Sequence, residues 1–319
     1  MDIVDSKLIA LLNKSIQTAL CILLLIQLSC SNNAVKTNID DEHDPGGQYV
    51  ELPPSYSYMD IFPVNRPNSD DVLFVRYAGD NAPSGVTSGI YILDIATKST
   101  RRIIRGDYGR CAWINSNVFY TVDNNNSNSL LLYMLDSQYK CYVDSIHGRN
   151  LNTSRDGSYL LVEKSEGLYV YNLGNLDQEV QYIGCYRHGC LSYSGNHLVA
   201  KAYASNGYSS NIIGLSLSGG ATINYTNPQQ YIDYDWPHIS NNMTHITYEK
   251  VLSMPDTTRI YNIYYHDINS NVNIVVSSGR YPSFSYDDNY IYYSSWNEYL
   301  EMRIYEYDIA CGITIQLTK

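Results

Sequence analysis

The chain has 319 residues, of which 44% are hydrophobic and 17% are charged, and its formal net charge is -11. This length and hydrophobic content suffice for a large core, and the negative charge disfavours nucleic acid and acidic polysaccharides as partners. The 33 Tyr, the 20 Gly and the many Asn and Ser residues favour an all-β protein with many short turns.

The amino-terminal segment predicts export from the cytoplasm. Residues 19–28 form an uncharged apolar run that follows Lys7 and Lys14. A helix that spans a bilayer needs roughly 20 such residues, so the run is too short for one. Its length is typical of the apolar region of a secretory signal.

A cysteine at the end of this run is the candidate lipidation site. The segment Leu28-Ser29-Cys30 resembles a bacterial lipobox, although Gln27 stands where that motif usually has Leu. The resemblance implies that residues 1–29 are a lipoprotein signal peptide. It also implies that an acylated Cys30 anchors the protein in the lipid bilayer of a bacterial cell envelope, at the outer membrane or the periplasmic face. An ordinary secreted protein and an uncleaved anchor are the alternatives.

The segment after Cys30 and the later cysteines fit an exported protein. Residues 30–48 are polar and carry an acidic cluster at 40–44, which predicts a disordered tether. Five cysteines follow Cys30, and an oxidising compartment permits disulfides. Cys185 and Cys190 are close enough in sequence to pair across a loop, while the odd number leaves a free thiol. The spacings contain no zinc-ligand pattern.

A repeat begins at about residue 60 and continues to the end of the chain. In its first half, a Ser precedes by six positions an aliphatic residue that opens an apolar strand. Four copies align without gaps, and they start at Ser154, Ser192, Ser240 and Ser285, with looser copies at Asn68 and Asn115. The strand-opening residues lie 46, 42, 38, 48 and 45 positions apart, and they are Val72, Val118, Leu160, Leu198, Ile246 and Ile291.

The second half of the repeat is another strand in which Tyr precedes Asp or Asn by three positions. It occurs at residues 90–95, 132–136, 168–173, 263–268 and 304–309, and the copy at 213–217 has lost its Tyr and Asp. A short β run such as residues 100–104 closes each unit. Each unit therefore has about four strands over about 40 residues, which is typical of a propeller blade.

These units predict the architecture of the folded domain. One four-stranded sheet cannot bury both faces, whereas a ring of sheets can. We therefore expect residues 49–319 to form an all-β, six-bladed β-propeller with four-stranded antiparallel blades, preceded by the signal peptide and the tether. Residues 49–52 are a candidate outer strand that joins the first and last blades.

The repeat resembles a known family. The Ser-x-Asp-Gly turn, the Ile-Tyr-x-x-Asp strand and the closing Leu-Thr are similar to TolB-like propeller repeats, which share the architecture of WD repeats without the Trp-Asp signature. The unit at 281–318 is the closest match. The resemblance implies the fold of about residues 60–319. It does not specify a function, because such repeats occur in interaction scaffolds, in propeller domains of serine peptidases and in polysaccharide lyases.

Two groups of residues are candidates for ligand binding. Arg149, Arg187 and Arg280 lie near the starts of three units, where they would form a positive patch that holds a carboxylate or sulfate. Salt bridges to acids of neighbouring loops are the alternative. The run from Tyr231 through Tyr234 to Trp236 is the best aromatic patch for a ligand. Most other tyrosines occupy repeated strand positions, where packing between blades explains them.

Three histidines are candidates for a metal site. His147, His188 and His238 lie at or just before the inner strands of blades three to five, so they could converge on a transition metal in the central channel. The alternative is three histidines with ordinary hydrogen bonds. We expect the second case, and the predicted protein has no metal and no other cofactor.

The remaining motifs favour binding over catalysis. The sequence contains no Gly-x-Ser-x-Gly nucleophile motif and no Gly-rich phosphate loop, and no hydrolase domain is expected after the last blade. We therefore expect no catalytic residues and a scaffold that presents its loops to a protein or carbohydrate. The alternative is a polysaccharide lyase or hydrolase with its site at the central channel.

Overall fold

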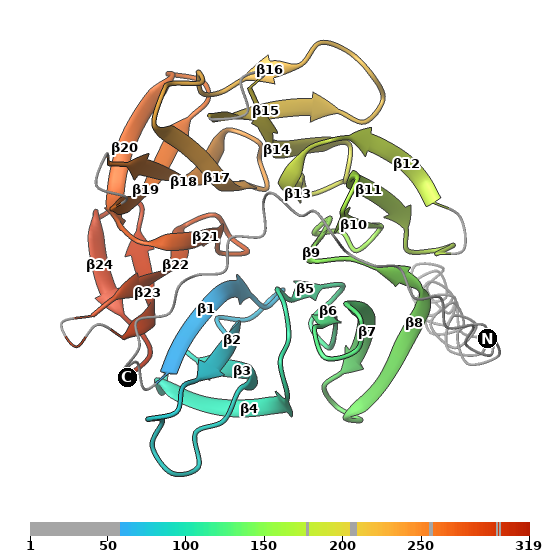
Figure 1. The fold of residues 1–319 in the computed structure, drawn as a ribbon, viewed down its shortest axis with the longest axis vertical. Coiled ribbons are helices and arrows are strands. Elements are labelled where there is room, and N and C mark those ends of the chain that lie inside the picture. Colours follow the sequence, from blue (N-terminus) through green and yellow to red (C-terminus); the bar gives the residue numbers. More distant parts are fainter. Residues whose placement is uncertain (1–57, 177–178, 205–208, 255–257, 298, 300) are drawn as a thin grey trace, which may run out of the picture.

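A computed structural model describes residues 58–319 except 177–178, 205–208, 255–257, 298 and 300. In this part of the chain, 24 β-strands form six antiparallel sheets of four strands each, arranged as blades around a central axis (Figure 1). None of the described residues belongs to a helix long and apolar enough to cross a membrane. The predicted signal peptide, the lipidation site Cys30, the tether and the strand at 49–52 lie outside the described residues.

Each blade is made of four consecutive strands, the first nearest the axis and the fourth on the outside (Figure 1). The strands of blades 1 to 3 are β1 (Tyr58–Asn65), β2 (Val72–Ala78), β3 (Gly89–Asp94), β4 (Ser99–Arg105), β5 (Ala112–Trp113), β6 (Val118–Asp123), β7 (Ser129–Met134), β8 (Tyr139–His147), β9 (Asn150–Thr153), β10 (Tyr159–Lys164), β11 (Gly167–Asn172) and β12 (Glu179–Gly184). The strands of blades 4 to 6 are β13 (Arg187–Leu191), β14 (His197–Tyr203), β15 (Ser210–Ser216), β16 (Ile223–Asn224), β17 (Ile232–Ile239), β18 (His245–Ser253), β19 (Arg259–Asp267), β20 (Val272–Ser278), β21 (Arg280–Phe284), β22 (Tyr290–Trp296), β23 (Met302–Asp308) and β24 (Ile313–Gln316). The predicted six-bladed propeller is confirmed.

The repeated serine organises the turn between the first and second strands of a blade. In four blades its hydroxyl accepts a hydrogen bond from the backbone N–H five residues later, at 2.9 to 3.1 Å. The residue three positions after each serine has a positive φ between 56° and 73°. Glycine adopts this conformation without a steric penalty, and it stands there in two of the four turns, as Gly157 and Gly195. The aligned sequence pattern therefore reflects one turn built four times.

The repeated Asp or Asn ends the third strand. The side chains of Asp94, Asn172, Asp267 and Asp308 each accept a hydrogen bond from a backbone N–H of the turn that follows, at 2.8 to 3.0 Å. Such side chains replace the strand partner that the backbone loses at the turn. The repeated Asp or Asn therefore stabilises the turn between the third and fourth strands.

The hydrophobic core lies between the blades. Six clusters of buried side chains fill the six junctions of the ring, and each cluster draws most of its members from two neighbouring blades. At the junction of blades 3 and 4, for example, Leu161 and Leu168 pack with Leu191 and Leu198. Burial of apolar area between sheets therefore holds the ring together.

The ring closes by packing of blade 6 against blade 1. In the described residues no blade takes a strand from the other end of the chain. Phe74 and Leu93 of blade 1 pack with Ile304 of blade 6. Arg303, which is 1% exposed, donates a hydrogen bond to the Tyr58 carbonyl at 3.0 Å, and its guanidinium lies 3.8 Å from the centre of the Tyr58 ring.

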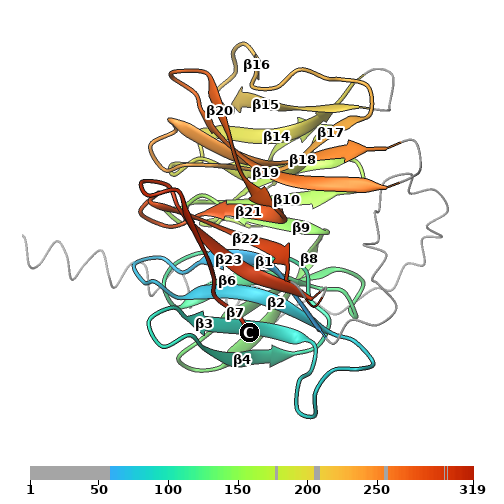
Figure 2. The same cartoon turned by 90° about the vertical axis from the view of Figure 1, so that its left-hand side faces the viewer.

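The chain runs in the same direction through every blade, so the strand ends form two faces. The loop face carries the connections between blades and the turns between second and third strands. The turn face carries the turns between first and second strands and those between third and fourth strands. In side view the two faces lie at opposite ends of the strands (Figure 2).

Candidate binding site at the propeller axis

Irregularities in four inner strands position side chains at the axis. The pairing register shifts within β1, β13, β17 and β21. At each shift one residue has a positive φ, and these residues are Phe62, His188, Trp236 and Tyr281, with φ between 46° and 57°. A left-handed residue other than glycine costs roughly 1–2 kcal/mol. Such bulges commonly re-aim a side chain, and here they do so at equivalent positions of four blades.

The four side chains meet and form what we call the axial aromatic cluster. The rings of His188 and Trp236 stack with 3.9 Å between their centres and an angle of 10°. The centre of the Phe62 ring lies 4.4 Å from that of Tyr281 and 5.1 Å from that of Trp236. Blades 1 and 4 face each other across the ring, so contacts between these residues place the cluster on the axis. Aromatic side chains therefore fill the centre of the propeller at this level.

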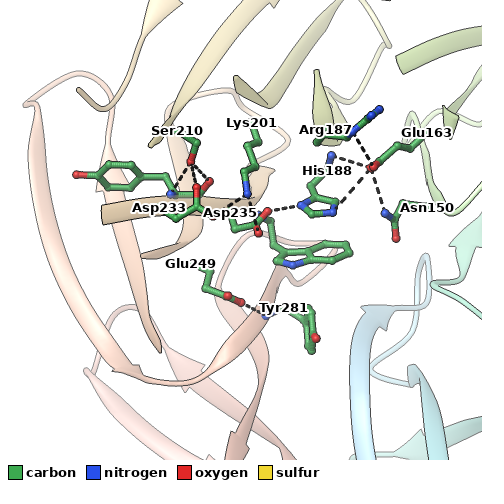
Figure 3. A network of polar contacts seen from close by, with 12 residues as sticks. Asn150, Glu163, Arg187, His188, Lys201, Ser210, Asp233, Asp235, Glu249 and Tyr281 are labelled. Atoms are coloured by element: carbon green, nitrogen blue, oxygen red, sulfur yellow. Dashed lines mark hydrogen bonds and ion pairs between the residues drawn. The ribbon is translucent and has the colours of Figure 1, made fainter. Parts of the chain in front are cut away.

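A network of charged groups surrounds the cluster between blades 3 and 6 (Figure 3). Glu163, Lys201 and Glu249 occupy the same position in the second strands of blades 3, 4 and 5, three residues after the strand-opening residue. Each contacts the inner strand of the following blade. The contacts are Glu163 with the His188 N–H at 2.8 Å, Lys201 Nζ with Asp233 at 2.8 Å and Asp235 at 3.2 Å, and Glu249 with Arg280 Nε at 3.3 Å.

His188 and Asp235 link these contacts into one network. The His188 Nδ1 atom contacts the Asp235 carboxylate. Burial opposes the charged form of His188, but the carboxylates of Asp235 and Glu163 outweigh it and raise its pKa. Burial likewise opposes the charged form of Asp235, but His188 and Lys201 outweigh it and lower its pKa. Opposite charges therefore alternate from blade to blade and satisfy one another.

The three predicted arginines differ in their surroundings. Arg280 is 6% exposed and pairs with Glu249. Arg187 donates hydrogen bonds to the carbonyls of Lys164 and Ser165 at 2.8 and 2.6 Å and lies 3.7 Å from Glu163. Arg149 is exposed. The salt-bridge alternative therefore describes Arg187 and Arg280, whose partners are glutamates of the preceding blade's second strand.

The predicted aromatic run is divided between surface and interior. Tyr231 is 62% exposed on the loop face, whereas Tyr234 and Trp236 are 5% and 7% exposed. Both buried residues belong to the inner strand β17, where Tyr234 packs against Tyr248 and the bulge directs Trp236 to the axis. Of this run, Tyr231 alone presents an aromatic surface to solvent.

The three predicted histidines have separate surroundings. His147 is exposed, with Nδ1 3.3 Å from the Ser127 carbonyl oxygen. His188 belongs to the axial aromatic cluster. His238 is 5% exposed, and its Nδ1 accepts a hydrogen bond from the Phe284 N–H at 3.3 Å. Among the described residues, no three His, Cys, Asp or Glu side chains are grouped as metal ligands.

The cysteines are all unpaired in the described residues. Cys185 is exposed, whereas Cys190 is buried on the inner strand of blade 4. The disulfide considered between them is therefore not formed.

Sequence reasoning missed the charged network, although the repeat contained a signal for it. Aligning the second strands places Glu163, Lys201 and Glu249 in one column of otherwise apolar strands. Charged residues are rarely buried unless paired, so this column marks positions that need partners in an adjacent blade.

The fold is a six-bladed β-propeller of the TolB-like arrangement. Similar solved structures include TolB from Acinetobacter baumannii, which has 13% identity, a TM-score of 0.59, and coverage of 82% of this chain and 63% of that chain. An oligogalacturonate lyase in complex with manganese has 12% identity, a TM-score of 0.51, and coverage of 84% and 79%. A puromycin-hydrolyzing peptidase of Mycobacterium tuberculosis has 9% identity, a TM-score of 0.50, and coverage of 82% and 54%.

These comparisons establish the fold alone. The chain spans less than two thirds of the TolB structure that it resembles. No family model matches the sequence, and no curated protein is similar to it. Because propellers with one architecture carry out unrelated functions, the function has to be argued from the residues of this chain.

Proposed function

We propose that this chain is a non-enzymatic, membrane-anchored binding propeller of the bacterial cell envelope, which presents its loop face to a protein or glycan. One observation carries the proposal. Exposed aromatic side chains gather on the loop face of blades 3 to 6, while the charged side chains that surround the axial aromatic cluster in these blades are paired with one another.

The aromatic side chains of the loop face form what we call the aromatic arc. Their exposed fractions range from 36% to 74%, and they are Tyr182, Tyr203, Tyr231, Trp296 and Tyr299. No large hydrophobic side chain among the described residues of blades 1 and 2 is exposed. The arc therefore covers one side of the loop face. Tyr and Trp combine an apolar surface with a polar group, and they are enriched in binding sites.

The axial residues support binding rather than catalysis. A lyase or hydrolase at the channel needs a group that is available to move a proton. Within the described residues, Lys201, Glu249 and Asp235 each contact an opposite charge, and Trp236 and Tyr281 fill the space beside them. These groups stabilise the junctions between blades.

The aromatic arc is tested by substitution. The full chain, purified in detergent, is applied to a glycan array and to candidate envelope proteins, and the affinity for each captured ligand is measured. Replacing Tyr231 and Tyr299 together with Ala should weaken binding by about tenfold or more. Tyr193→Ala is the control, because Tyr193 is 45% exposed on the turn face. Equal binding by the double variant and the wild type would refute the assignment of the arc.

The anchor rests on the sequence alone. Cys30→Ser should abolish incorporation of labelled fatty acid and release the protein from the membrane fraction. Persistence of the label in this variant would show that Cys30 is not the acylated residue.

A further inference from the structure

A small cavity lies on the axis between the axial aromatic cluster and the turn face. Every blade contributes at least one residue to its lining, among them Asn65, Cys111, Thr153, Cys190, His238 and Phe284. The space open to the centres of water molecules is about 40 Å³. One water needs about 10–15 Å³ by this measure, so the cavity has room for a few waters or one small ion.

A cationic side chain lines this cavity, although the protein as a whole is acidic. Arg155 of blade 3 lies in its lining and reaches across the axis, where it donates hydrogen bonds to the carbonyls of Phe284 and Ser285 at 3.1 and 2.7 Å. Its ion pair with Asp288 is long, at 3.9 Å. None of the lining residues is Asp or Glu.

Arg110 is a second buried guanidinium near the cavity: it is not one of the lining residues, but it directly precedes the lining residue Cys111. It precedes the inner strand β5 of blade 2, and it is 5% exposed. It forms no ion pair or side-chain hydrogen bond with any residue that the structure describes; its contact is with the ring of Trp236, at 5.9 Å. Its charge lies close enough to influence the pKa values of Cys111, Cys190 and His238. A buried guanidinium without a counter-charge is costly.

His238 supplies a neutral donor. Its Nδ1 accepts the Phe284 N–H, so the proton of the neutral ring is on Nε2. Burial, together with the charges of Arg155 and Arg110, lowers the pKa of His238 well below its ordinary value. The ring therefore stays neutral at pH 7, and its remaining nitrogen is a hydrogen-bond donor.

We propose that this cavity binds one small oxyanion, a carboxylate, sulfate or phosphate, held by the guanidinium group of Arg155 and the imidazole of His238, with the unpaired charge of Arg110 close by. Guanidinium groups bind such anions through paired N–H donors. The anion would supply the counter-charge that Arg110 otherwise lacks. The site lies on the opposite side of the axial aromatic cluster from the aromatic arc. The proposal of an anion site therefore does not depend on whether the aromatic arc binds a ligand.

Equilibrium dialysis tests the site directly. The full chain in detergent is dialysed into a buffer whose anion is too bulky for the cavity, and labelled sulfate, phosphate and acetate are added separately. We expect saturable binding of at least one of them with one site per chain. Arg110→Met and Arg155→Gln should each weaken this binding by about tenfold or more. Arg101→Met is the control, because Arg101 is an exposed residue of the outer strand β4.

Thermal unfolding of the same proteins separates binding from folding. Without added anion, Arg110→Met should melt at or above the wild-type temperature, because it removes an unpaired buried charge. At the same anion concentration, the melting temperature of the wild type should rise by more than that of Arg110→Met. The proposal is overturned if none of the three anions binds saturably below about 10 mM, or if either folded variant binds as the wild type does.

Discussion

Replacing Lys201 with Met removes the positive charge between two carboxylates. The Lys201 side chain is 5% exposed and contacts Asp233 and Asp235, whose side chains are 27% and 7% exposed. Breaking a buried ion pair by removal of one partner costs about 3–5 kcal/mol. Asp235 keeps His188 as a partner and Asp233 reaches solvent, so we expect the lower end, about 3 kcal/mol at pH 7.

The destabilisation caused by Lys201→Met should depend on pH in a direction that follows from the pKa of Asp235. In the wild type, Asp235 has a lowered pKa; its stability contribution is present above the ordinary Asp value of about 4 and is lost as the pH falls through the folded-state pKa. In the variant, Lys201 no longer favours the charged form of Asp235, so burial raises the pKa of this carboxyl above its wild-type value. As the pH falls, Asp235 is therefore protonated in the variant before it is protonated in the wild type, and the cost of its buried charge disappears. The difference in unfolding free energy between the two proteins should therefore narrow as the pH falls from about 7 to about 4.5.

Urea unfolding followed by tryptophan fluorescence measures this difference. Trp236 stacks on His188 and reports on the network directly. Lys140→Met is the control, because Lys140 is exposed on β8, and it should change the unfolding free energy by less than about 0.5 kcal/mol. A deficit below about 1 kcal/mol for Lys201→Met, or one that does not narrow at lower pH, would refute the reasoning.

Three further predictions address the turn, the histidine and the thiols. Ser285→Ala removes the hydroxyl that accepts the Tyr290 N–H at 2.9 Å and should cost about 1–3 kcal/mol, whereas exposed Ser218→Ala should cost little; equal costs in urea unfolding would contradict the role of the serine. Because the pKa of His188 is raised, the charged imidazole contributes fully to the unfolding free energy below about pH 6.5, and this contribution is lost as the pH rises through the folded-state pKa. The stability advantage of the wild type over His188→Gln should therefore shrink at alkaline pH. An advantage that stays constant with pH would contradict a charged His188. In native protein a thiol reagent should modify exposed Cys185 and Cys311 quickly and buried Cys111 and Cys190 only after unfolding, since burial raises the pKa of Cys111 to about 12; rapid native modification of Cys190 would disprove this.

The fold was predictable because its signals are local. Ser285 bonds to a backbone group five residues away, and Asp308 bonds to one three residues away. Each pattern therefore survives in sequence wherever the turn is repeated. The apolar strand-opening residues, such as Leu198 and Ile246, are fully buried, and their spacing marks one blade after another.

The axial site was only partly predictable because its contacts cross blades. Lys201 and Asp235 are 34 residues apart, and the sequence does not say that they meet. The four bulge residues, Phe62, His188, Trp236 and Tyr281, are different amino acids, and their shared aromatic character is common among the inner and outer strands of this Tyr-rich chain. Trp236 therefore looked like a surface aromatic, and Arg110 carried no pattern that marked it.

The closure of the ring has a mechanical consequence. The polypeptide itself crosses five of the six junctions, whereas in the described residues the junction between blades 6 and 1 is held by non-covalent contacts such as those of Arg303 with Tyr58 and Ile304 with Phe74. At this junction, which we call the seam, blades 6 and 1 can separate while each sheet keeps all four of its strands. A circular permutant that joins the two ends and cuts the chain between blades 3 and 4 would move the seam, and the first region to exchange its amide hydrogens should move with it.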